Sequence, residues 1–302
     1  MKLRLMKLKL EPSEPFNLDA TLCCGQVFRW ERLEQWWYGV VRDKVLKIRQ
    51  LGGNQLEFDS ADAGFVKAYF RLDDDLPEIY EQIGKDEYAR QAIKAYRGLR
   101  ILRQDPWECL ISYICATYKN IASIKQMLLN LSRRFGDKIS LDGASFYTFP
   151  TSQSLAKADI KELAECSLGY RTKYVSETAK IIERTGFDFE SLRKADCEIA
   201  RKALLGFPGV GKKVADCVLL FSLDKLEAFP VDVWVKRVIA RHYSKHFSEE
   251  FVEKISRERS PTVSEYDRLN GFGRQYFGDY AGYAQEYLYH YERMMGQTDL
   301  LR

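Results

Sequence analysis

Hydrophobic residues alternate with polar ones along the first 60 positions, which is typical of β-strands with one buried face. The expected strands are residues 3–10, 27–30, 36–41, 45–48 and 56–58. A turn at Gly52-Gly53-Asn54 precedes the last of them. These segments predict an antiparallel sheet with one solvent-facing side. Residues 61–70 and 76–96 show helical spacing, and we expect them to cover the other side.

From Gly98 onward the hydrophobic positions recur at helical spacing, and we expect helices throughout. Asp105-Pro106 begins one of them, because proline is tolerated in a first helical turn. Further helices are expected at residues 121–135, 159–166, 172–185, 198–205, 211–223, 232–243, 248–257, 262–272 and 279–294. The pattern predicts an α+β chain, with an antiparallel sheet domain at 1–98 and a helical domain at 99–302.

The composition excludes several classes of protein. The chain has 302 residues, of which 46% are hydrophobic, so it can bury an ample core. Its seven cysteines are scattered and odd in number, which argues against a disulfide framework and favours a reducing compartment. Only three histidines and no C-x-x-C pair are present, so we expect no metal. No cysteine follows Cys217, which excludes a C-terminal iron–sulfur loop.

The first ten residues alternate apolar and basic side chains and lack the apolar run of a signal peptide. No segment approaches the length of a membrane span, so we expect a soluble intracellular protein that is not bound to a membrane. Its place would be the cytoplasm or nucleoid, or the nucleus in a eukaryote. The net charge is only +4, but residues 201–245 hold nine Lys/Arg and four Asp/Glu. This surplus fits either a phosphate-binding face or an ordinary solvated surface.

The most informative motif is Gly206–Asp216, which is followed by Asp232 in Phe-Pro-Val-Asp. Pro208–Gly211 predicts a tight hairpin between two helices. Its glycines let backbone amides approach an anion, and the positive end of the second helix points there. A lysine in the first turn of that helix, with a carboxylate further along, indicates amine nucleophile chemistry on DNA held by its phosphates. The alternative is a helix–turn–helix corner with a solvated lysine.

Residues 205–217 together with 229–232 resemble the helix–hairpin–helix DNA glycosylase superfamily. Four further segments narrow the resemblance to the 8-oxoguanine DNA glycosylase family: Gly25–Trp30, Leu102–Cys109, Leu168–Arg171 and Gly282–Gln285. Together they touch nearly the whole chain in the family's order. The resemblance implies a monomer without a cofactor that excises 8-oxoguanine from duplex DNA. It would form a Schiff base and nick the strand by β-elimination, with the C-terminal helices contributing to the base pocket.

The resemblance assigns the nucleophile to Lys213 and a second catalytic role to Asp232. Lys213 and Cys217 are four residues apart and share a helix face, whereas Lys212 points about a quarter turn away. The helix end, Lys212 and partial burial should disfavour the charged amine. Asp232 would offset positive charge on a sugar that is losing its base. Its alternative role is a helix N-cap, and the two roles are compatible.

A target base must leave the duplex before C1′ can be reached. By the resemblance, the backbone carbonyl of Gly25 accepts from N7–H of the oxidised base, and Gln285 reads its Watson–Crick edge. Cys217 and Tyr289 cover the two faces of the base, with tyrosine in place of the family's usual phenylalanine. On local evidence alone, Gly25 could equally be a strand-entry turn, and Gln285 or Tyr289 a core or surface residue.

Contacts with the rest of the DNA are expected from a second group. By the resemblance, Tyr170 and Arg171 enter the gap left by the flipped base and contact its partner. The alternative for both is packing. The other members of the group are Gly209, Gly211, Lys212 and Asn120.

Two departures from the family pattern affect specificity. Tyr118 and Ser123 stand where the family has an asparagine and an arginine that inspect the opposite cytosine, so only Arg171 is retained of three contacts. We therefore expect a relaxed opposite-base preference. Trp234 replaces a common histidine and cannot make that histidine's hydrogen bonds.

Two other functions remain possible on this sequence. One is a monofunctional glycosylase for other damaged bases, although such enzymes typically lack the hairpin lysine. The other is a non-catalytic DNA-binding module.

Overall fold

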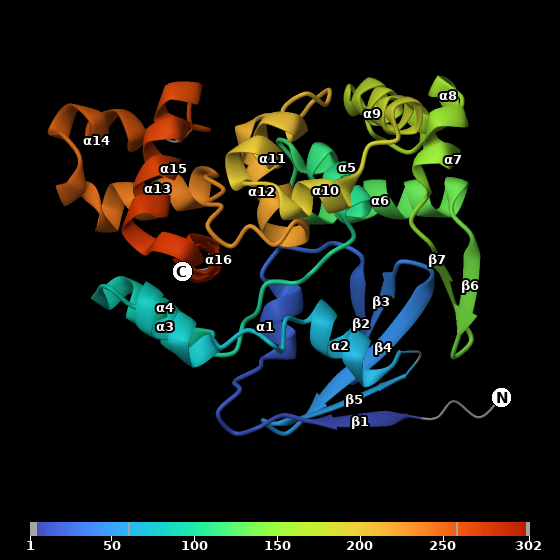
Figure 1. The fold of residues 1–302 in the computed structure, drawn as a ribbon, viewed down its shortest axis with the longest axis horizontal. Helices are drawn as coiled ribbons and strands as arrows, with labels where there is room; N and C mark the ends of the chain where they lie inside the picture. Colours follow the sequence, from blue (N-terminus) through green and yellow to red (C-terminus); the bar gives the residue numbers. More distant parts are fainter. Residues whose placement is uncertain (1–4, 60, 258, 300–302) are drawn as a thin grey trace.

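The computed structural model describes residues 5–59, 61–257 and 259–299. Five antiparallel strands form a sheet in the order β1-β5-β4-β3-β2 (Figure 1). Their bounds are β1 Met6–Lys9, β2 Trp30–Leu33, β3 Trp36–Val41, β4 Lys44–Leu51 and β5 Gln55–Asp59. Helices make up most of the rest of the described chain, which confirms the predicted α+β class. The expected strand at 27–30 is wrong, because only Trp30 of it joins the sheet.

One face of the sheet packs against α1 (Leu18–Cys23) and α2 (Ala63–Tyr69) in a separate hydrophobic cluster. Alternate side chains of a strand point to the same face of a sheet, and on this face Leu46, Ile48 and Phe58 are almost completely buried. Residues 61–70 were predicted to cover the sheet, and α2 confirms this prediction. The short helix α1 was missed because it lies within a segment of mainly strand-like pattern.

The remaining helices enclose the larger hydrophobic cluster. Before the long C-terminal part they are α3 Leu76–Ile83, α4 Glu87–Ala95, α5 Pro106–Ala116, α6 Ile121–Phe135, α7 Ser152–Lys157, α8 Ile160–Glu165, α9 Arg171–Thr185, α10 Phe189–Lys194 and α11 Cys197–Leu204. The rest are α12 Lys212–Ser222, α13 Val233–His242, α14 Glu249–Ile255, α15 Val263–Phe277 and α16 Ala281–Asp299, with short 3₁₀ turns at Ser244–His246 and Gly278–Tyr280.

Two helices correct the expectation for residues 76–96. The chain breaks at Gly84–Asp86, where Asp86 caps α4 by accepting a bond from Ala89 N at 2.9 Å. Instead of covering the sheet, α3 and α4 pack on α16: Tyr80 Oη lies 2.9 Å from Tyr287 Oη. The hydrophobic cluster therefore runs across Gly98, and the domain boundary at that residue stays a prediction.

A β-hairpin interrupts the region that was expected to be helical throughout. It consists of β6 (Lys138–Leu141) and β7 (Ala144–Tyr147), joined by Asp142-Gly143, a typical two-residue hairpin turn. Phe146 stacks on Tyr38 of β3 with ring centroids 5.6 Å apart. Lys47 donates to Asp142 at 2.5 Å. Side-chain contacts thus attach the hairpin to the sheet.

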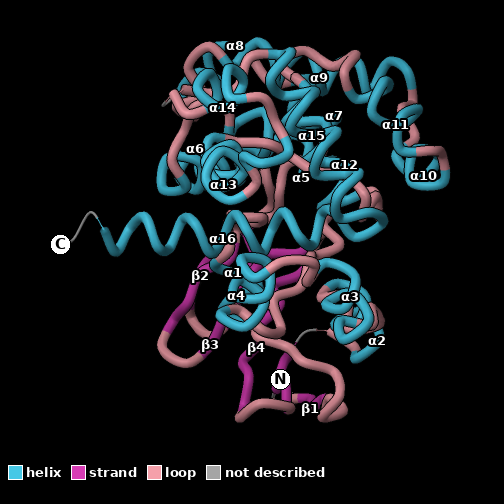
Figure 2. Tube along the Cα trace, turned by 90° about the vertical axis from the view of Figure 1, so that its left-hand side faces the viewer, coloured by secondary structure: helices cyan, strands magenta, loops and turns pink. Residues whose placement is uncertain are grey.

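Helix α16 lies across the middle of the molecule, between the helical layer and the sheet with α1–α4 (Figure 2). It approaches α12 closely, since a Cβ on Gly282 would lie 2.1 Å from Leu220 Cδ1. The position of α16 places its side chains next to both the hairpin helix and the first loop of the sheet domain. Within the described ranges, no helix is both long enough and apolar enough to cross a bilayer.

Candidate active site

The hairpin between α11 and α12 has the geometry that its glycines predict. Gly209 adopts a φ of +77°, and a Cβ there would lie 2.5 Å from the Tyr174 ring. Both the backbone angle and the close ring require glycine. Gly211 is exposed and is the N-cap of α12, with no side chain capping the helix. The first amides of α12 are therefore open to an anion such as a DNA phosphate.

The two lysines that open α12 differ in their partners. Lys212 Nζ lies 2.5 Å from both carboxylate oxygens of Asp267 on α15. Lys213 is half-buried and has neither a hydrogen bond nor an ion pair within the described part of the chain. An amine without a partner is available to a ligand, so Lys213 is the better placed of the two to react.

Asp232 is the N-cap of α13. Its Oδ1 accepts from Trp234 N and Val235 N, both at 2.9 Å. Its other oxygen, Oδ2, has no hydrogen-bond partner among the described residues. The cap orients the carboxylate and leaves one oxygen available, so the capping geometry is compatible with the catalytic role that remains a prediction.

A buried polar network connects the segment before Asp232 to α12. Asp216 Oδ2 accepts from Asn270 Nδ2 at 3.0 Å and from Arg201 at 2.9 Å. The same Asn270 amide donates to Phe229 O at 2.8 Å. Burial raises the pKa of Asp216 to about 6, although Arg201 opposes the shift. Asn270 therefore joins α12 to the segment that precedes Asp232.

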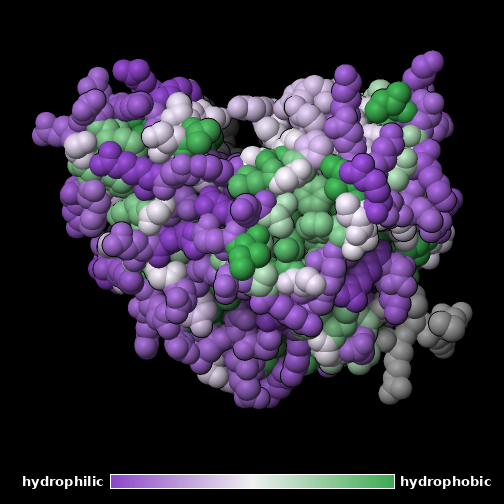
Figure 3. Space-filling view, turned by 45° about the horizontal axis from the view of Figure 1, so that its top comes forward, coloured by the Kyte–Doolittle hydropathy of each residue, from purple (hydrophilic) through white to green (hydrophobic). Residues whose placement is uncertain are grey.

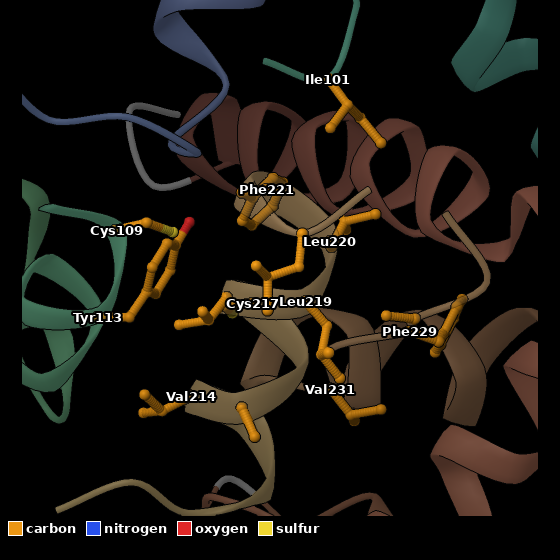
Figure 4. Close-up of a cluster of buried hydrophobic side chains, with 14 of the residues drawn as sticks. Ile101, Cys109, Tyr113, Val214, Cys217, Leu219, Leu220, Phe221, Phe229 and Val231 are labelled. Atoms are coloured by element: carbon orange, nitrogen blue, oxygen red, sulfur yellow. The ribbon is translucent and has the colours of Figure 1, made fainter. Parts of the chain in front are cut away.

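Cys217 lies one turn after Lys213 and is 3% exposed. Burial raises the pKa of its thiol; the Lys213 charge lowers that pKa and the Asp232 charge raises it. Both charges therefore act on this one side chain. Figure 4 shows Cys217 on the side of α12 that faces Tyr113 of α5. The structure thus brings Lys213, Asp232 and Cys217 into one site.

Gly25 lies near the same site, because the next residue, Gln26, is hydrogen-bonded to Tyr113. Tyr113 Oη donates to Gln26 O at 3.1 Å, and the Gln26 side chain bonds Arg100 O and Leu102 N, each at 2.8 Å. Gly25 itself has a φ of +108°, a conformation that other residues rarely adopt. A Cβ there would lie 3.3 Å from Tyr289 Oη, so Gly25 and Tyr289 face each other.

Helix α16 adds two buried polar side chains, each with one oxygen that has no hydrogen bond among the described residues. Gln285 and Glu286 are 5% and 2% exposed, and the Oε1 atom of each lacks a hydrogen bond in the described chain. Such atoms are uncommon in cores because desolvation is not offset. Burial raises the pKa of Glu286 to about 7, with Arg293 opposing and Asp232 adding to the shift. Two buried oxygens without a hydrogen bond, one of them on a side chain that senses the Asp232 charge, indicate a place for a polar ligand.

The residues predicted to meet the opposite strand take different positions. Tyr170 is 56% exposed, but Arg171 is 2% exposed and donates to Thr117 O and Leu168 O. Asn120 Oδ1 caps α6 by accepting from Ser123 N at 2.8 Å. In this conformation Arg171 and Asn120 are therefore engaged within the protein, and their DNA contacts stay predictions.

Sequence reasoning missed three features of the site. Glu286 and Arg293 lie on α16 beside the predicted base-binding residues, and only their spacing from Gln285 and Tyr289 could have revealed them. Tyr118 is a departure from the family pattern, but its 80% exposure and φ of +54° were not foreseeable.

Figure 3 shows hydrophobic residues gathered in the middle of one face, surrounded by hydrophilic ones.

Comparisons with known proteins agree with this geometry. Residues 7–110 match the family described as 8-oxoguanine DNA glycosylase, N-terminal domain, and residues 111–261 match the HhH-GPD superfamily of base excision DNA repair proteins. The N-glycosylase/DNA lyase of Saccharomyces cerevisiae is 34% identical over 96% of this chain and 86% of its own length.

Two solved structures are similar over nearly the whole chain. MBOgg1 in complex with a low-affinity DNA ligand has a TM-score of 0.86 and 34% identity, covering 98% of this chain and all of that one. The Clostridium acetobutylicum 8-oxoguanine glycosylase/lyase, in complex with double-stranded DNA containing cytosine opposite 8-oxoguanine, has a TM-score of 0.84 and 30% identity, with the same coverage. This chain belongs to the 8-oxoguanine DNA glycosylase family.

Proposed function

We propose that this protein is a bifunctional DNA glycosylase and AP lyase that excises 8-oxoguanine from double-stranded DNA. The observation that carries the proposal is the half-buried, unpartnered amine of Lys213 at the start of the hairpin helix, with Asp232 acting on the same neighbour, Cys217. A phosphate-binding helix end, a nucleophile and a carboxylate in one site are what base excision through a covalent intermediate requires.

The reaction follows from these groups. The Lys213 amine attacks C1′ with its nitrogen lone pair, and a C–N bond forms as the N-glycosidic bond breaks and the base leaves with the bonding electrons. Asp232 offsets the positive charge that develops on the sugar. Opening of the sugar ring then gives an imine with Lys213. Loss of a proton from C2′ expels the 3′-phosphate, which nicks the strand by β-elimination.

The base pocket is formed by residues from both parts of the chain. Gly25 supplies a backbone acceptor, Gln285 reads the Watson–Crick edge, and Cys217 and Tyr289 cover the faces of the base. The unpaired Oε1 of Gln285 supports this role, since a donor on the base edge would satisfy it. The backbone of the flipped nucleotide would lie on the open amides after Gly211.

We further propose that the enzyme discriminates weakly against the base opposite the lesion. Tyr118 and Ser123 stand in place of the family's asparagine and arginine, respectively, and Arg171 is occupied with Thr117 O and Leu168 O. Contacts to the orphaned base would then come mainly from aromatic stacking by Tyr170, which is tolerant of base identity. We expect a monomer that acts inside the cell, where its DNA substrate is.

The test is base release from otherwise identical duplexes that contain 8-oxoguanine, uracil or methylated adenine. We expect release and strand nicking with 8-oxoguanine alone. Release of methylated adenine without nicking would favour a monofunctional glycosylase, and binding without any release a DNA-binding module.

Opposite-base preference is measured with 8-oxoguanine paired in turn with each of the four bases. Similar excision rates are expected. A strong preference for cytosine would contradict the relaxed discrimination.

A further inference from the structure

Helix α16 presents three polar side chains on one face of the base pocket. Gln285, Tyr289 and Arg293 are four residues apart, so they lie along one stripe of the helix. The first and last are separated by eight residues, or about 12 Å along the helix axis. A side chain at each end and an aromatic ring between them would bracket a stacked purine from its two opposite edges.

Arg293 connects the two walls of the pocket. It is 7% exposed, and its guanidinium donates to Cys23 O at 2.8 Å and to Tyr289 Oη at 3.1 Å. A Cβ built on Gly25 would lie 2.7 Å from Arg293 Nη1. The guanidinium therefore lies directly against Gly25, whose carbonyl is the proposed acceptor for N7–H of the lesion.

The cation is buried without a full set of partners. Arg293 Nε is buried and has no hydrogen bond within the described residues, and no carboxylate forms an ion pair with the guanidinium there. Burial lowers the pKa of Arg293, but Tyr289, Cys24 and Glu286 outweigh that effect and raise it. Its neighbour His290, 3.3 Å away, has a pKa lowered to about 4 by burial and by Arg293. Arg293 is thus the cation at this end of the pocket.

The chemistry of the lesion fits this arrangement. 8-Oxoguanine differs from guanine by a donor at N7 and an acceptor at O8, side by side on the same edge. A carbonyl acceptor adjacent to a cationic donor is complementary to that pair. Guanine offers a lone pair at N7 and only a C–H at C8, so it would meet the Gly25 carbonyl unfavourably and would present no O8 acceptor to the cation.

We propose that Arg293 is a specificity-determining residue that recognises the O8 oxygen of the lesion while the Gly25 carbonyl accepts from N7–H. The inference rests on the proposed function and identifies which atom of that substrate the site selects. Gln285, at the other end of the stripe, then serves the opposite edge of the same base.

The experiment measures DNA affinity in the full-length protein carrying Lys213→Gln, so that the substrate is not consumed. Arg293→Met, which removes the charge and keeps a similar length, and Arg293→Lys are added to this background. Three duplexes are compared: one with 8-oxoguanine, one with guanine at the same position, and one with a tetrahydrofuran abasic analogue, which has no base. Arg241→Met on α13 is the matched control, since Arg241 pairs with Glu292 of α16 and is exposed.

A hydrogen bond to a charged group predicts that Arg293→Met weakens binding of the 8-oxoguanine duplex about tenfold or more. Affinities for the guanine and abasic duplexes should stay unchanged, Arg293→Lys should recover part of the loss, and Arg241→Met should leave the ratios unaltered. An equal loss on all three duplexes would show that Arg293 only holds the Gly25 loop, and would overturn the proposal, as would no loss at all. If the parent Lys213→Gln protein shows no preference for 8-oxoguanine, the proposed function fails instead.

Discussion

Asp232 caps α13, we propose that it also acts in catalysis, and two substitutions separate these roles. Asp232→Asn keeps a side-chain oxygen that can accept from Trp234 N and Val235 N, so the cap of α13 is retained. Asp232→Ala removes both the cap and the charge. If Asp232 acts through its charge, the two variants should lose base release alike and differ only in stability.

The cap geometry and Coulomb's law set the expected magnitudes. Loss of an N-cap side chain costs about 1 kcal/mol, so Asp232→Ala should lower the free energy of unfolding by that amount and the Asn variant hardly at all. A carboxylate about 4 Å from a full positive charge contributes about 4 kcal/mol at an effective dielectric constant of about 20. Losing that term in the transition state would slow base release about a thousandfold.

The assay combines denaturant unfolding with single-turnover release of 8-oxoguanine. Asp62 provides the matched control, because it caps α2 by accepting from Phe65 N at 2.8 Å, is exposed and belongs to the sheet domain. Asp62→Ala should lose similar stability and keep its rate. Base release within about tenfold of wild type in Asp232→Asn would refute the electrostatic role. Equal losses of rate in Asp232→Ala and Asp62→Ala would mean that the slower base release results from lost stability and not from the lost charge.

Three further predictions test other parts of the account. Because burial raises the pKa of Glu286 from its ordinary 4.5 to about 7, the folded state binds this proton more tightly than the unfolded chain, and stability should fall as pH rises from about 4.5 to 7. Denaturant unfolding across pH 4–9 should show a fall of about 3 kcal/mol at most that is missing in Glu286→Gln; parallel curves for the two proteins would contradict this. Gly209→Ala should lose about 1–3 kcal/mol through backbone strain, with a further loss from the clash with Tyr174, whereas Gly143→Ala has the same φ of +77° with open space and should lose only the strain. Equal thermal shifts for these two variants would mean that the Tyr174 contact does not matter. DNA affinity should fall steeply between 50 and 200 mM salt, by roughly tenfold or more, because α12 and its basic surroundings bind phosphates; a flat salt dependence in a titration would argue against that.

The parts of the fold that the sequence predicts are those with local causes. The hairpin at Pro208–Gly211 is predictable because Gly209 takes a positive φ that other residues rarely adopt. The start of α5 is predictable because Asp105 caps the helix and Pro106 occupies its first turn. The β6–β7 hairpin escaped prediction because β7 is held by Phe146 on Tyr38, more than a hundred residues earlier. Its Asp-Gly turn was the available signal.

The site residues also divide into those that a local pattern predicts and those that depend on distant contacts. Lys213 and Asp232 are found by motif spacing, because the helix that begins at Lys212 fixes which lysine shares a face with Cys217. The spacing of Arg293 from Gln285 and Tyr289 indicates only a shared helix face, because its contact with the carbonyl of Cys23 depends on the other end of the chain. The inward position of Arg171 was equally hidden, because it depends on a loop carbonyl 54 residues away.

Borohydride trapping tests the central claim most directly. An imine between the enzyme and an 8-oxoguanine duplex would be reduced to a stable amine, which gives a covalent protein–DNA adduct. Wild type and Lys212→Gln are compared with Lys213→Gln at DNA concentrations that saturate binding. We expect the adduct with the first two and none with Lys213→Gln. An adduct that persists without Lys213, or that disappears when Lys212 is replaced, would contradict the assignment of the nucleophile.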